Sequence, residues 1–511
     1  MPNAAPDTPY DAISGPRRLV AGFLLALSNF MVVLDLTIAN VSIPHISGSL
    51  GITMDQGTWI ITSYAVAEAI VVPLTGWLAL RFGSVRVFTA AMLGFGIFSL
   101  LCGISQTLGM LVAFRIGQGI CGGPIMPLSQ TLMLRVFPPE HRGAALGAWV
   151  MTLSLGPATG PIIGGWISDN LSWHWIFLIN VPFAAASTFA AYLLLRPVET
   201  QTERLPIDKI GLMLLVFWIG CLQIMLDIGR DHDWFGDWKV VGLSIAALVG
   251  FLAFVIWELT EEHPIVDLRI FRFRTFTVSA LAMALCFGSF FAGIVVVPQW
   301  LQASMGYSAT QAGMVTAMHA YAVLLAAQFA ARMIGRVDPR LMISLGVTWI
   351  ALMTLWASFW TSGTPFWHLA LPMFLLGFGM PFMMIPLTQI PLQTVPSRET
   401  ANAAGLQSFM RTMATAISTS IVMTLWSDSE RVKQTGLAGQ LNPEDAMASL
   451  ATLGFSNEQA LLLIHRMVQN EATTLAVNYT FQVSGFLLLA SAALIWLMPR
   501  VRLGDASPSG H

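Results

Sequence analysis

The sequence predicts an all-α integral membrane protein with 14 membrane-spanning helices. Only 10% of its 511 residues are charged and 55% are hydrophobic, whereas soluble domains contain about 25% charged residues. The hydrophobic residues are gathered in segments close to the ~20 residues that cross a bilayer as a helix. The connections between them alternate between basic and nearly neutral, as expected for a chain that crosses repeatedly.

Fourteen apolar segments follow one another along the chain. Six lie at 19–43, 57–79, 87–105, 108–133, 143–167 and 174–195; two at 208–228 and 239–258; and six at 275–300, 309–331, 339–361, 366–391, 401–425 and 478–498. An even number of crossings places both termini on the same side of the membrane.

The basic residues predict which side that is. Of the 25 Lys and Arg residues, 18 fall in one set of connections, five in the opposite set and two, Arg115 and Arg411, inside spans. Basic loops stay on the cytoplasmic side, so we expect both termini in the cytoplasm. The polar segment 426–476 then faces away from the cytoplasm; it is either a functional, partner-binding element or a tolerated surface insertion.

Two pairs of short sequences indicate an internal repeat. DQGTW at the second segment is echoed by TQAGM at the tenth, and VFPPEHRGAALG before the fifth is echoed by VPSRETANAAGL before the thirteenth. Segments seven and eight are then an inserted pair, and the repeat places a binding site between two halves near the bilayer midplane. The predicted division is a tail 1–18, a six-helix bundle 19–196, the inserted pair with its loops 197–274, a second six-helix bundle 275–498 and a tail 499–511.

The fifth segment is unusually rich in helix-weakening residues. Glycine and proline cost about 1 and about 3 kcal/mol in an exposed helix, but in a membrane small residues let another helix approach closely. The pattern predicts either a packing seam that can bend or an ordinary tight helix contact. The residues concerned are Gly156, Pro157, Gly160, Pro161, Gly164 and Gly165.

Several motifs resemble those of a known transporter family. GPATGPIIGGW resembles the antiporter motif on the fifth helix of drug-exporting members of the major facilitator superfamily. WHWIFLINVP, LQIMLDIGRDHDWF and ELTEEHPIVDLRIF extend the resemblance over nearly the whole chain, to the fourteen-helix EmrB-type multidrug exporters.

The resemblance implies two six-helix major-facilitator halves around the inserted pair. It also implies proton-coupled export of hydrophobic or amphipathic small molecules across the bacterial inner membrane, driven by the proton gradient without a cofactor. A periplasmic adaptor of the EmrA type and an outer-membrane channel of the TolC type are the implied partners.

Three charged residues inside spans are the candidates for proton coupling, because charges in a bilayer are costly. Asp35 lies in LDLTIANVSIP and Arg115 in FRIGQGICGG, which resemble the first-helix motif and the basic motif of the same family; Glu68 lies in the second span. An acid whose surroundings alternate between an apolar cavity and an arginine can take up and release a proton. The alternative is that Asp35 and Arg115 form a fixed ion pair.

The loop GWLALRFGSVR resembles the cytoplasmic gate motif of the superfamily. Gly76, Arg81, Gly83 and Arg86 match its glycines and basic positions, whereas Leu80 stands where the motif has an acid. The usual charge-based lock of the gate is therefore in doubt, and topology alone could explain the arginines.

Substrate-binding residues are the least determined. Methionine and aromatic side chains suit promiscuous apolar cavities, but the chain has 27 Met and 31 Phe, so packing explains most of them equally well. The candidates are Asn40, Gln118, Trp149, Tyr321, Phe382, Met410 and Arg411.

Other function classes find little support. The histidines show no metal-ligand spacing, the four cysteines lie in apolar stretches, and there is no GxxxxGK[ST] phosphate loop. The net charge of −2 gives no sign of nucleic-acid binding. We expect a transporter, neither an enzyme nor a metal-binding protein; a dedicated exporter of one metabolite or siderophore-like compound and a passive facilitator remain the alternatives.

Overall fold

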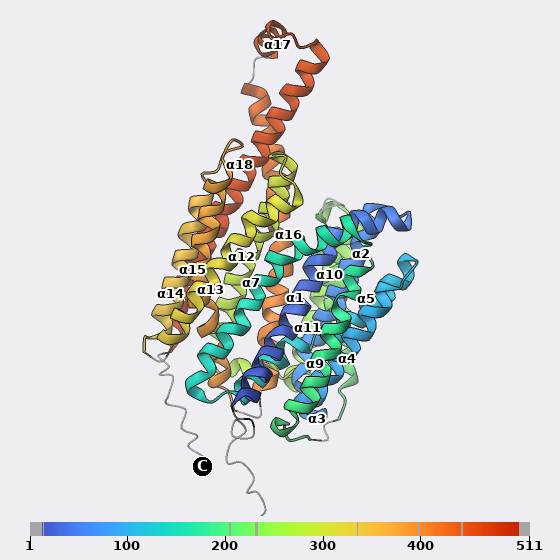
Figure 1. Ribbon diagram of the computed structural model, residues 1–511, viewed down its shortest axis with the longest axis vertical. Helices are drawn as coiled ribbons and strands as arrows, with labels where there is room; N and C mark the ends of the chain where they lie inside the picture. Colours follow the sequence, from blue (N-terminus) through green and yellow to red (C-terminus); the bar gives the residue numbers. More distant parts are fainter. Residues whose placement is uncertain are drawn as a thin grey trace, which may run out of the picture.

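The computed structural model describes residues 13, 15–203, 206–229, 234–334, 336–396, 399–440 and 443–499. All regular secondary structure in these ranges is helical, and most helices run along the long axis of the molecule (Figure 1). The expected all-α membrane fold is confirmed. The outer parts of the predicted tails 1–18 and 499–511 lie beyond the described residues.

The elements follow the order of the predicted segments. The first part of the chain contains α1 (Pro16–Leu50), α2 (Met54–Val71), η2 (Val72–Leu74), α3 (Thr75–Phe82), α4 (Ser84–Gly103), α5 (Leu108–Gly122), α6 (Ile125–Val136), α7 (Pro139–Asn170), α8 (Trp175–Leu178) and α9 (Asn180–Leu194). The middle part contains η3 (Arg196–Val198), α10 (Lys209–Ile228), η4 (Trp234–Gly236), α11 (Trp238–Thr260) and η5 (Leu268–Arg272). The last part contains α12 (Arg274–Ser304), α13 (Ala309–Met333), α14 (Pro339–Ala357), α15 (Phe366–Gln393), α16 (Thr400–Gln440), α17 (Pro443–Thr452), α18 (Asn457–Leu494) and η6 (Ile495–Leu497).

Each predicted span coincides with one helix or with consecutive helices. In the described part of the chain, 12 helical stretches are long and apolar enough to cross a membrane, and α7 is a thirteenth when its bent halves are counted together. The remaining segment, 401–425, forms the first part of α16. Its many Ser, Thr, Asn and Gln side chains lower its hydropathy, and α12 and α18 pack against it.

The same helix pairings occur in the first and last parts of the chain. In the first part α1 packs on α7, α2 on α5, and α4 on both α5 and α9. In the last part α12 packs on α16, α13 on α15, and α14 on both α15 and α18. The inserted helices α10 and α11 pack on each other, and α10 also touches α2 and α16. The residue boundaries of the division stay a prediction.

The helices form two groups: the first comprises α1 to α9 and the second comprises α12 to α18. The two groups meet through α7, which packs on α13, and through α16, which packs on η2, α3 and α6. We call the end of the bundle that carries the α3–α4 turn (residues 82–84) the gate end. Close backbone contacts join the groups there: Gly76 faces the backbone of Asn402, and Gly143 faces the carbonyl of Ala331. The gate end is therefore closed in this structure.

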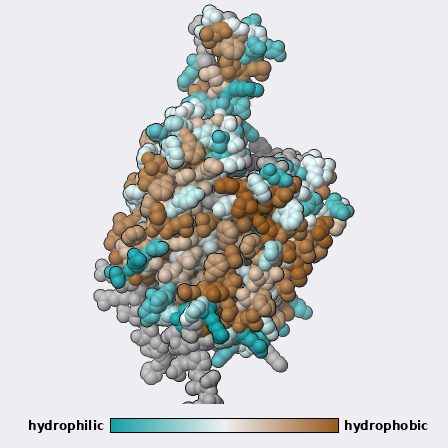
Figure 2. Space-filling view, viewed as in Figure 1, coloured by the Kyte–Doolittle hydropathy of each residue, from teal (hydrophilic) through white to brown (hydrophobic). Residues whose placement is uncertain are grey.

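At the opposite end, α16 and α18 extend well beyond the other helices and α17 caps them (Figure 1). We call residues 426–476 the hairpin. Hydrophobic side chains cover much of the middle of the bundle in Figure 2, whereas hydrophilic ones are frequent at the base of the hairpin. The polar segment expected from the sequence is thus an elongated helical projection.

Candidate functional site

A buried ion pair joins α1 and α5 inside the first group of helices. Arg115 Nη1 lies 2.6 Å from Asp35 Oδ2, and the two side chains are 0% and 1% exposed. Such a pair is stable in an apolar interior only when further hydrogen bonds satisfy both groups.

The Asp35 carboxylate has two additional donors. Gln118 Nε2 donates to Asp35 Oδ1 over 3.0 Å and Asn180 Nδ2 donates to the same oxygen over 2.7 Å. Both amides also donate to Ser99 Oγ, over 3.2 Å each, and Ser99 donates to the carbonyl of Phe177. Three donors directed at one carboxylate match its ionised form, which is an acceptor only.

The Arg115 guanidinium is held from three sides. Its Nε donates to the carbonyl of Ile60 over 3.0 Å, and Nη1 also donates to Gln118 Oε1 over 2.8 Å. The guanidinium carbon lies 4.3 Å from the Tyr64 ring centre and 5.6 Å from that of Phe177, within cation–π range. Arg115 Nη2 has no hydrogen-bond partner among the described residues.

Glycines next to Arg115 let α5 approach its neighbours. A Cβ on Gly119 would lie 2.5 Å from the carbonyl oxygen of Tyr64 on α2, and one on Gly117 would overlap the ring of Phe98 on α4. The FRIGQGICGG pattern therefore places the arginine and allows the close packing that buries it.

Glu68 lies one turn beyond Tyr64 on α2 and differs from Asp35 in its surroundings. It is 7% exposed, and no hydrogen bond to its carboxylate is seen among the described residues. The charges of Arg411 and Arg115 both act on it. It is a buried acid that lacks the fixed donors of Asp35.

Arg411 reaches across the two groups of helices. It projects from α16, is 6% exposed, and its Nη2 contacts Met126 Sδ on α6. Its guanidinium carbon lies 5.4 Å from the ring centre of Phe287 on α12. A thioether is a weak acceptor, so this arginine is only weakly satisfied by the protein.

The glycine seam of α7 faces α1. Thr37 Oγ1 donates to the carbonyl of Gly156 over 3.2 Å. A Cβ on each seam glycine would overlap or crowd α1: Gly156 would meet Val33, Gly160 would meet Thr37 and Gly164 would meet Ile38. The seam therefore packs within one group of helices, not between the two groups.

In this structure α7 is bent at its seam, the segment for which the sequence left open a seam that can bend or a tight helix contact. The axes of Pro139–Pro157 and Ile162–Ser168 differ by 42°. A Cβ on Gly165 would meet no atom within 4 Å, so this glycine takes no part in the seam. The side chain of Pro161 lies outside the described part of the structure, although its backbone is in the helix.

The gate motif forms the α3–α4 corner. A Cβ on Gly76 would lie 2.5 Å from Asn402 Cβ on α16, so only glycine permits this approach. Gly83 has φ +94°, a conformation that side chains disfavour. The guanidinium carbon of Arg81 lies 5.3 Å from the centre of the Trp77 ring, so this contact is made within the corner itself.

Arg86, the last basic position of the motif, is exposed, and its Nε lies 4.0 Å from the carboxylate of Glu199. That acid comes from the segment between α9 and α10 and was not singled out by the sequence. The contact shows that an acid does reach the gate corner despite Leu80.

The residues predicted to bind substrate differ in their surroundings. Gln118 belongs to the Asp35 network, and Trp149 is fully buried with its Nε1 donating to Ser129 Oγ over 2.9 Å. Asn40 is exposed, whereas Met410 is partly buried.

Tyr321 lies on an exposed face of α13. It is 57% exposed and shares one face of α13 with exposed Leu325 and Phe329, at the spacing of four residues that defines a helix face. Phe382 is partly buried, and its Cβ faces Gly346 on α14. Arg411 is buried and contacts Met126 of the other group of helices.

Sequence reasoning missed Asn180 and Tyr64. Asn180 is the one amide side chain in the segment 174–195, and a polar residue in an apolar span is itself a signal. Tyr64 had no comparable signal, because aromatic residues are common in every span.

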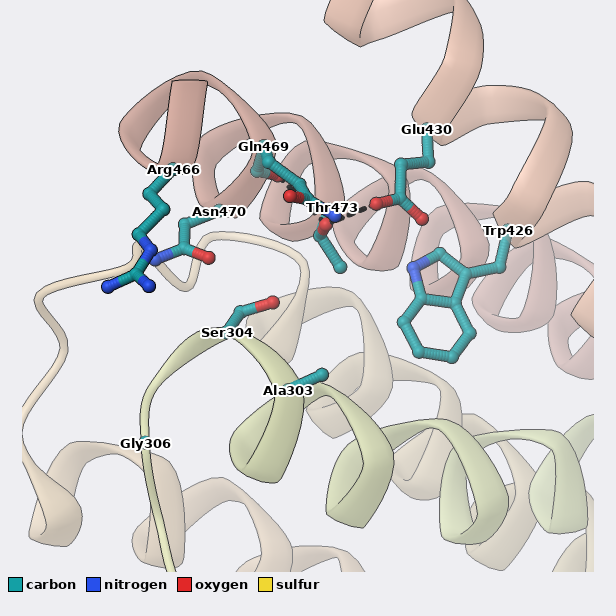
Figure 3. Close-up of a pocket in the computed structure, with 9 residues that line it drawn as sticks. All are labelled: Ala303, Ser304, Gly306, Trp426, Glu430, Arg466, Gln469, Asn470 and Thr473. Atoms are coloured by element: carbon teal, nitrogen blue, oxygen red, sulfur yellow. Dashed lines mark hydrogen bonds between the residues drawn. The ribbon is translucent and has the colours of Figure 1, made fainter. Parts of the chain in front are cut away.

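A separate cavity of about 520 Å³ lies at the base of the hairpin (Figure 3). It is lined by Trp426 and Glu430 of α16 and by Arg466, Asn470 and Thr473 of α18, with the end of α12 as its floor. Thr473 Oγ1 donates to Glu430 Oε1 over 2.6 Å, which joins the two arms of the hairpin. This cavity is distinct from the Asp35 network.

Comparisons with known proteins identify the family. The model of the Major Facilitator Superfamily matches residues 25–419. The multidrug export protein EmrB of Escherichia coli K12 is 41% identical over 506 residues, which cover 98% of this chain and 99% of that protein. This chain belongs to the EmrB-type group of the major facilitator superfamily.

Other EmrB-type relatives have the same extent. The fatty acid resistance protein FarB of Neisseria gonorrhoeae is 38% identical over 96% of this chain and 97% of its own length. The probable multidrug resistance protein EmrY of Escherichia coli K12 is 38% identical over 94% of this chain and 97% of its own length.

Two solved structures share the major facilitator fold with this chain. The human organic anion transporter MFSD10 aligns with a TM-score of 0.54 at 14% identity, over 93% of this chain and 100% of that one. A bacterial homolog of the human lysosomal transporter Spinster, in an inward-facing conformation, aligns with a TM-score of 0.52 at 15% identity, over 97% of this chain and 100% of that one. The chain is a multi-pass membrane transporter and not an enzyme.

Proposed function

We propose that this protein exports hydrophobic or amphipathic small molecules in exchange for protons, without a cofactor. Membership of the EmrB-type group supports export, since the relatives include multidrug export proteins and a fatty acid resistance protein. The observation that carries proton coupling is the buried Asp35–Arg115 pair between α1 and α5.

The proposed coupling step is a change in what holds Asp35. Protonation would remove its charge and convert one acceptor oxygen into a donor, so that Arg115, Gln118 and Asn180 could not all keep their present hydrogen bonds. The helices that these residues join would then be free to move relative to one another. A fixed pair, by contrast, would keep its geometry through the transport cycle.

Glu68 is the second proposed proton carrier. It lacks fixed donors, lies on the same helix face as Tyr64, and feels the charge of Arg411 from the other group of helices. Protonation of Glu68 would weaken this attraction between the two groups, and binding of a charged substrate group could have the same effect. We place the substrate near Glu68 and Arg411.

The test is proton movement driven by substrate in proteoliposomes. We expect the native protein to move protons when a lipophilic substrate is added, and both Asp35→Asn and Arg115→Ala to abolish that movement while remaining folded. Glu262→Gln, which alters an exposed acid away from the site, should behave as the native protein. Substrate equilibration with no proton movement in the native protein would make it a facilitator, and full coupling in Asp35→Asn would make Asp35 structural and Glu68 the carrier.

We further propose that the gate end faces the cytoplasm of a bacterial inner membrane and the hairpin faces the periplasm. The distribution of basic residues supports this orientation. The hairpin would contact an EmrA-type adaptor that leads to a TolC-type channel. Exposed apolar side chains on the projection support a docking role; they are Val432, Leu453, Leu461, Leu462 and Met467.

A further inference from the structure

The α3–α4 corner lacks the acid of the gate motif, because Leu80 occupies that position, but it receives a carboxylate from another segment. Glu199 Oε1 accepts from the backbone N–H of Val85 over 2.9 Å, and Oε2 accepts from the N–H of Arg86 over 3.1 Å. Both N–H groups belong to the first turn of α4, where a helix has no internal acceptors for them. The N-cap residue of α4 is Gly83, which has no side chain that could cap this end.

Neighbouring residues of the same segment complete the contact. Ser84 N–H donates to Thr200 Oγ1 over 2.8 Å, and the N–H of Glu203 donates to the carbonyl of Leu80, at the end of α3, over 2.8 Å. Trp77 Nε1 on α3 donates to the carbonyl of Pro206 over 3.2 Å. The segment therefore bonds to the end of one helix and the start of the next.

Arg135 at the end of α6 holds this segment from the other side. Its Nε donates to the carbonyl of Val198 over 3.1 Å, and its Nη2 donates to the carbonyl of Glu199 over 3.3 Å. Arg135 thus holds the Glu199 backbone in place, and this positions the Glu199 side chain beside α4.

The close approach explains the glycine at the corner. A Cβ on Gly83 would lie 2.7 Å from the Glu199 carboxylate, and the φ of +94° disfavours any side chain there. Gly83 is therefore required both for the turn and for the carboxylate that caps α4. A negative group at this position also complements the positive end of the helix dipole.

The other side of the corner faces the second group of helices. Gly76 on α3 packs against the backbone of Asn402, and the carbonyl of Val72 packs against Gly405 on α16. The orientation of α3 therefore decides whether this seal between the groups can form. Glu199, through α4, and the backbone of Glu203, through α3, fix that orientation.

We propose that Glu199 is a positioning residue of the gate, which replaces the missing acid at Leu80 and stabilises the state closed at the gate end. The segment that carries it continues into α10, which packs on α2 and α16. The inserted helix pair is thereby tied to the gate. The inference rests on the proposed transport cycle for its functional meaning, but its central prediction concerns a conformational equilibrium.

The experiment measures a distance across the gate end without substrate or a proton gradient. Spin labels are placed at Glu140→Cys and Arg336→Cys, two exposed positions near the Gly143–Ala331 contact, with the four native cysteines replaced by alanine. Double electron–electron resonance then gives the closed and open populations. Loss of a side-chain cap changes an equilibrium by roughly two- to thirtyfold, so we expect Glu199→Ala to lower the ratio of closed to open molecules by about fivefold.

Conservative variants separate gating from simple loss of structure. Glu199→Gln, which keeps one acceptor oxygen but loses the charge, should give an intermediate shift, and Glu262→Gln on another exposed loop should give none. The rate of substrate transport should decrease as the fraction of molecules closed at the gate end decreases. The number of protons moved per substrate should stay at the native value. Folded Glu199→Ala and Glu199→Gln with the native distance distribution would overturn the proposal, even if the proton-coupling assignment stands. A native number of protons per substrate together with an altered spin-label distance distribution would support the proposal.

Discussion

At the scale of single residues, burial decides what the charged groups of this protein can do. The Arg115–Asp35 pair is inaccessible to solvent, so neither group can exchange its partner for water in this state. A buried pair adds little net stability over apolar residues, but removing one partner leaves an unpaired charge and costs about 3–5 kcal/mol. In the proposed coupling step, protonation of Asp35 would therefore also have to provide a new partner for the Arg115 charge.

This argument gives a stability prediction. Arg115→Ala should lower the free energy of unfolding by about 3–5 kcal/mol, because Asp35 stays buried without its cation. The double variant Asp35→Asn/Arg115→Met should regain part of that loss, since it leaves no unpaired charge. Thermal unfolding in detergent measures both.

Arg272→Gln serves as the control, because Arg272 is 59% exposed in its pair with Glu399 and such pairs contribute about 0–1 kcal/mol. Equal destabilisation by Arg115→Ala and Arg272→Gln would contradict the prediction.

At the scale of elements, α7 serves two interfaces with different residues. Its seam glycines at 156, 160 and 164 pack on α1. Gly143 and Gly147, nearer the gate end, face Ala331 and Ile385 of the other group of helices. The 42° bend lies within the seam, so the helix stays in contact with α1 on both sides of it.

Two alanine substitutions in α7 test the seam. Gly160→Ala places a Cβ against the Thr37 side chain, so α1 and α7 must separate, and we expect a marked loss of substrate transport at normal expression. Gly165→Ala meets no atom within 4 Å and should leave transport unchanged, with stability equal or higher by up to about 1 kcal/mol. Similar transport rates for the two variants would show that the seam tolerates a methyl group.

At the scale of the whole molecule, the hairpin is a projection whose two arms are joined at the base by Thr473 and Glu430. The bundle below it has its own helix pairings. The proposed proton-coupling residues lie in the bundle, so the projection should be dispensable for transport itself.

Shortening the hairpin tests this separation of roles. Residues 434–469 are replaced by about four flexible residues, enough to join helices 8–10 Å apart. We expect transport in proteoliposomes to persist, whereas cells that depend on a periplasmic adaptor should lose resistance to the exported compound. Loss of transport in proteoliposomes would place the hairpin in the transport cycle, and full resistance in cells would exclude it as the docking surface.

Much of the architecture follows from the sequence, because the bilayer imposes one solution on apolar segments of this length. Composition gave the membrane class, and the spacing of segments gave the helix order that the structure confirms. The full lengths of two helices were harder to predict from the sequence, because α16 and α18 continue into the polar hairpin without a break. Polar helical extensions carry no hydropathy signal.

The candidate site was predictable only in part. Asp35, Glu68, Arg115 and Arg411 stand out in the sequence because a charge in an apolar span is costly. The partners of these charges were not predictable. Asn180 lies 145 positions from Asp35 and Glu199 lies 114 positions from Val85, and no local pattern relates residues so far apart.

By itself the sequence determined that this protein crosses a membrane repeatedly, which charged residues lie in its apolar spans, and which segment carries the glycines and prolines of the α7 seam. The tertiary structure decided which helix meets the glycine seam, which donors surround Asp35, and which acid reaches the corner left without one at Leu80. The physical reason is that hydropathy and backbone preference act on each segment alone. Pairing depends on which side chains packing brings together.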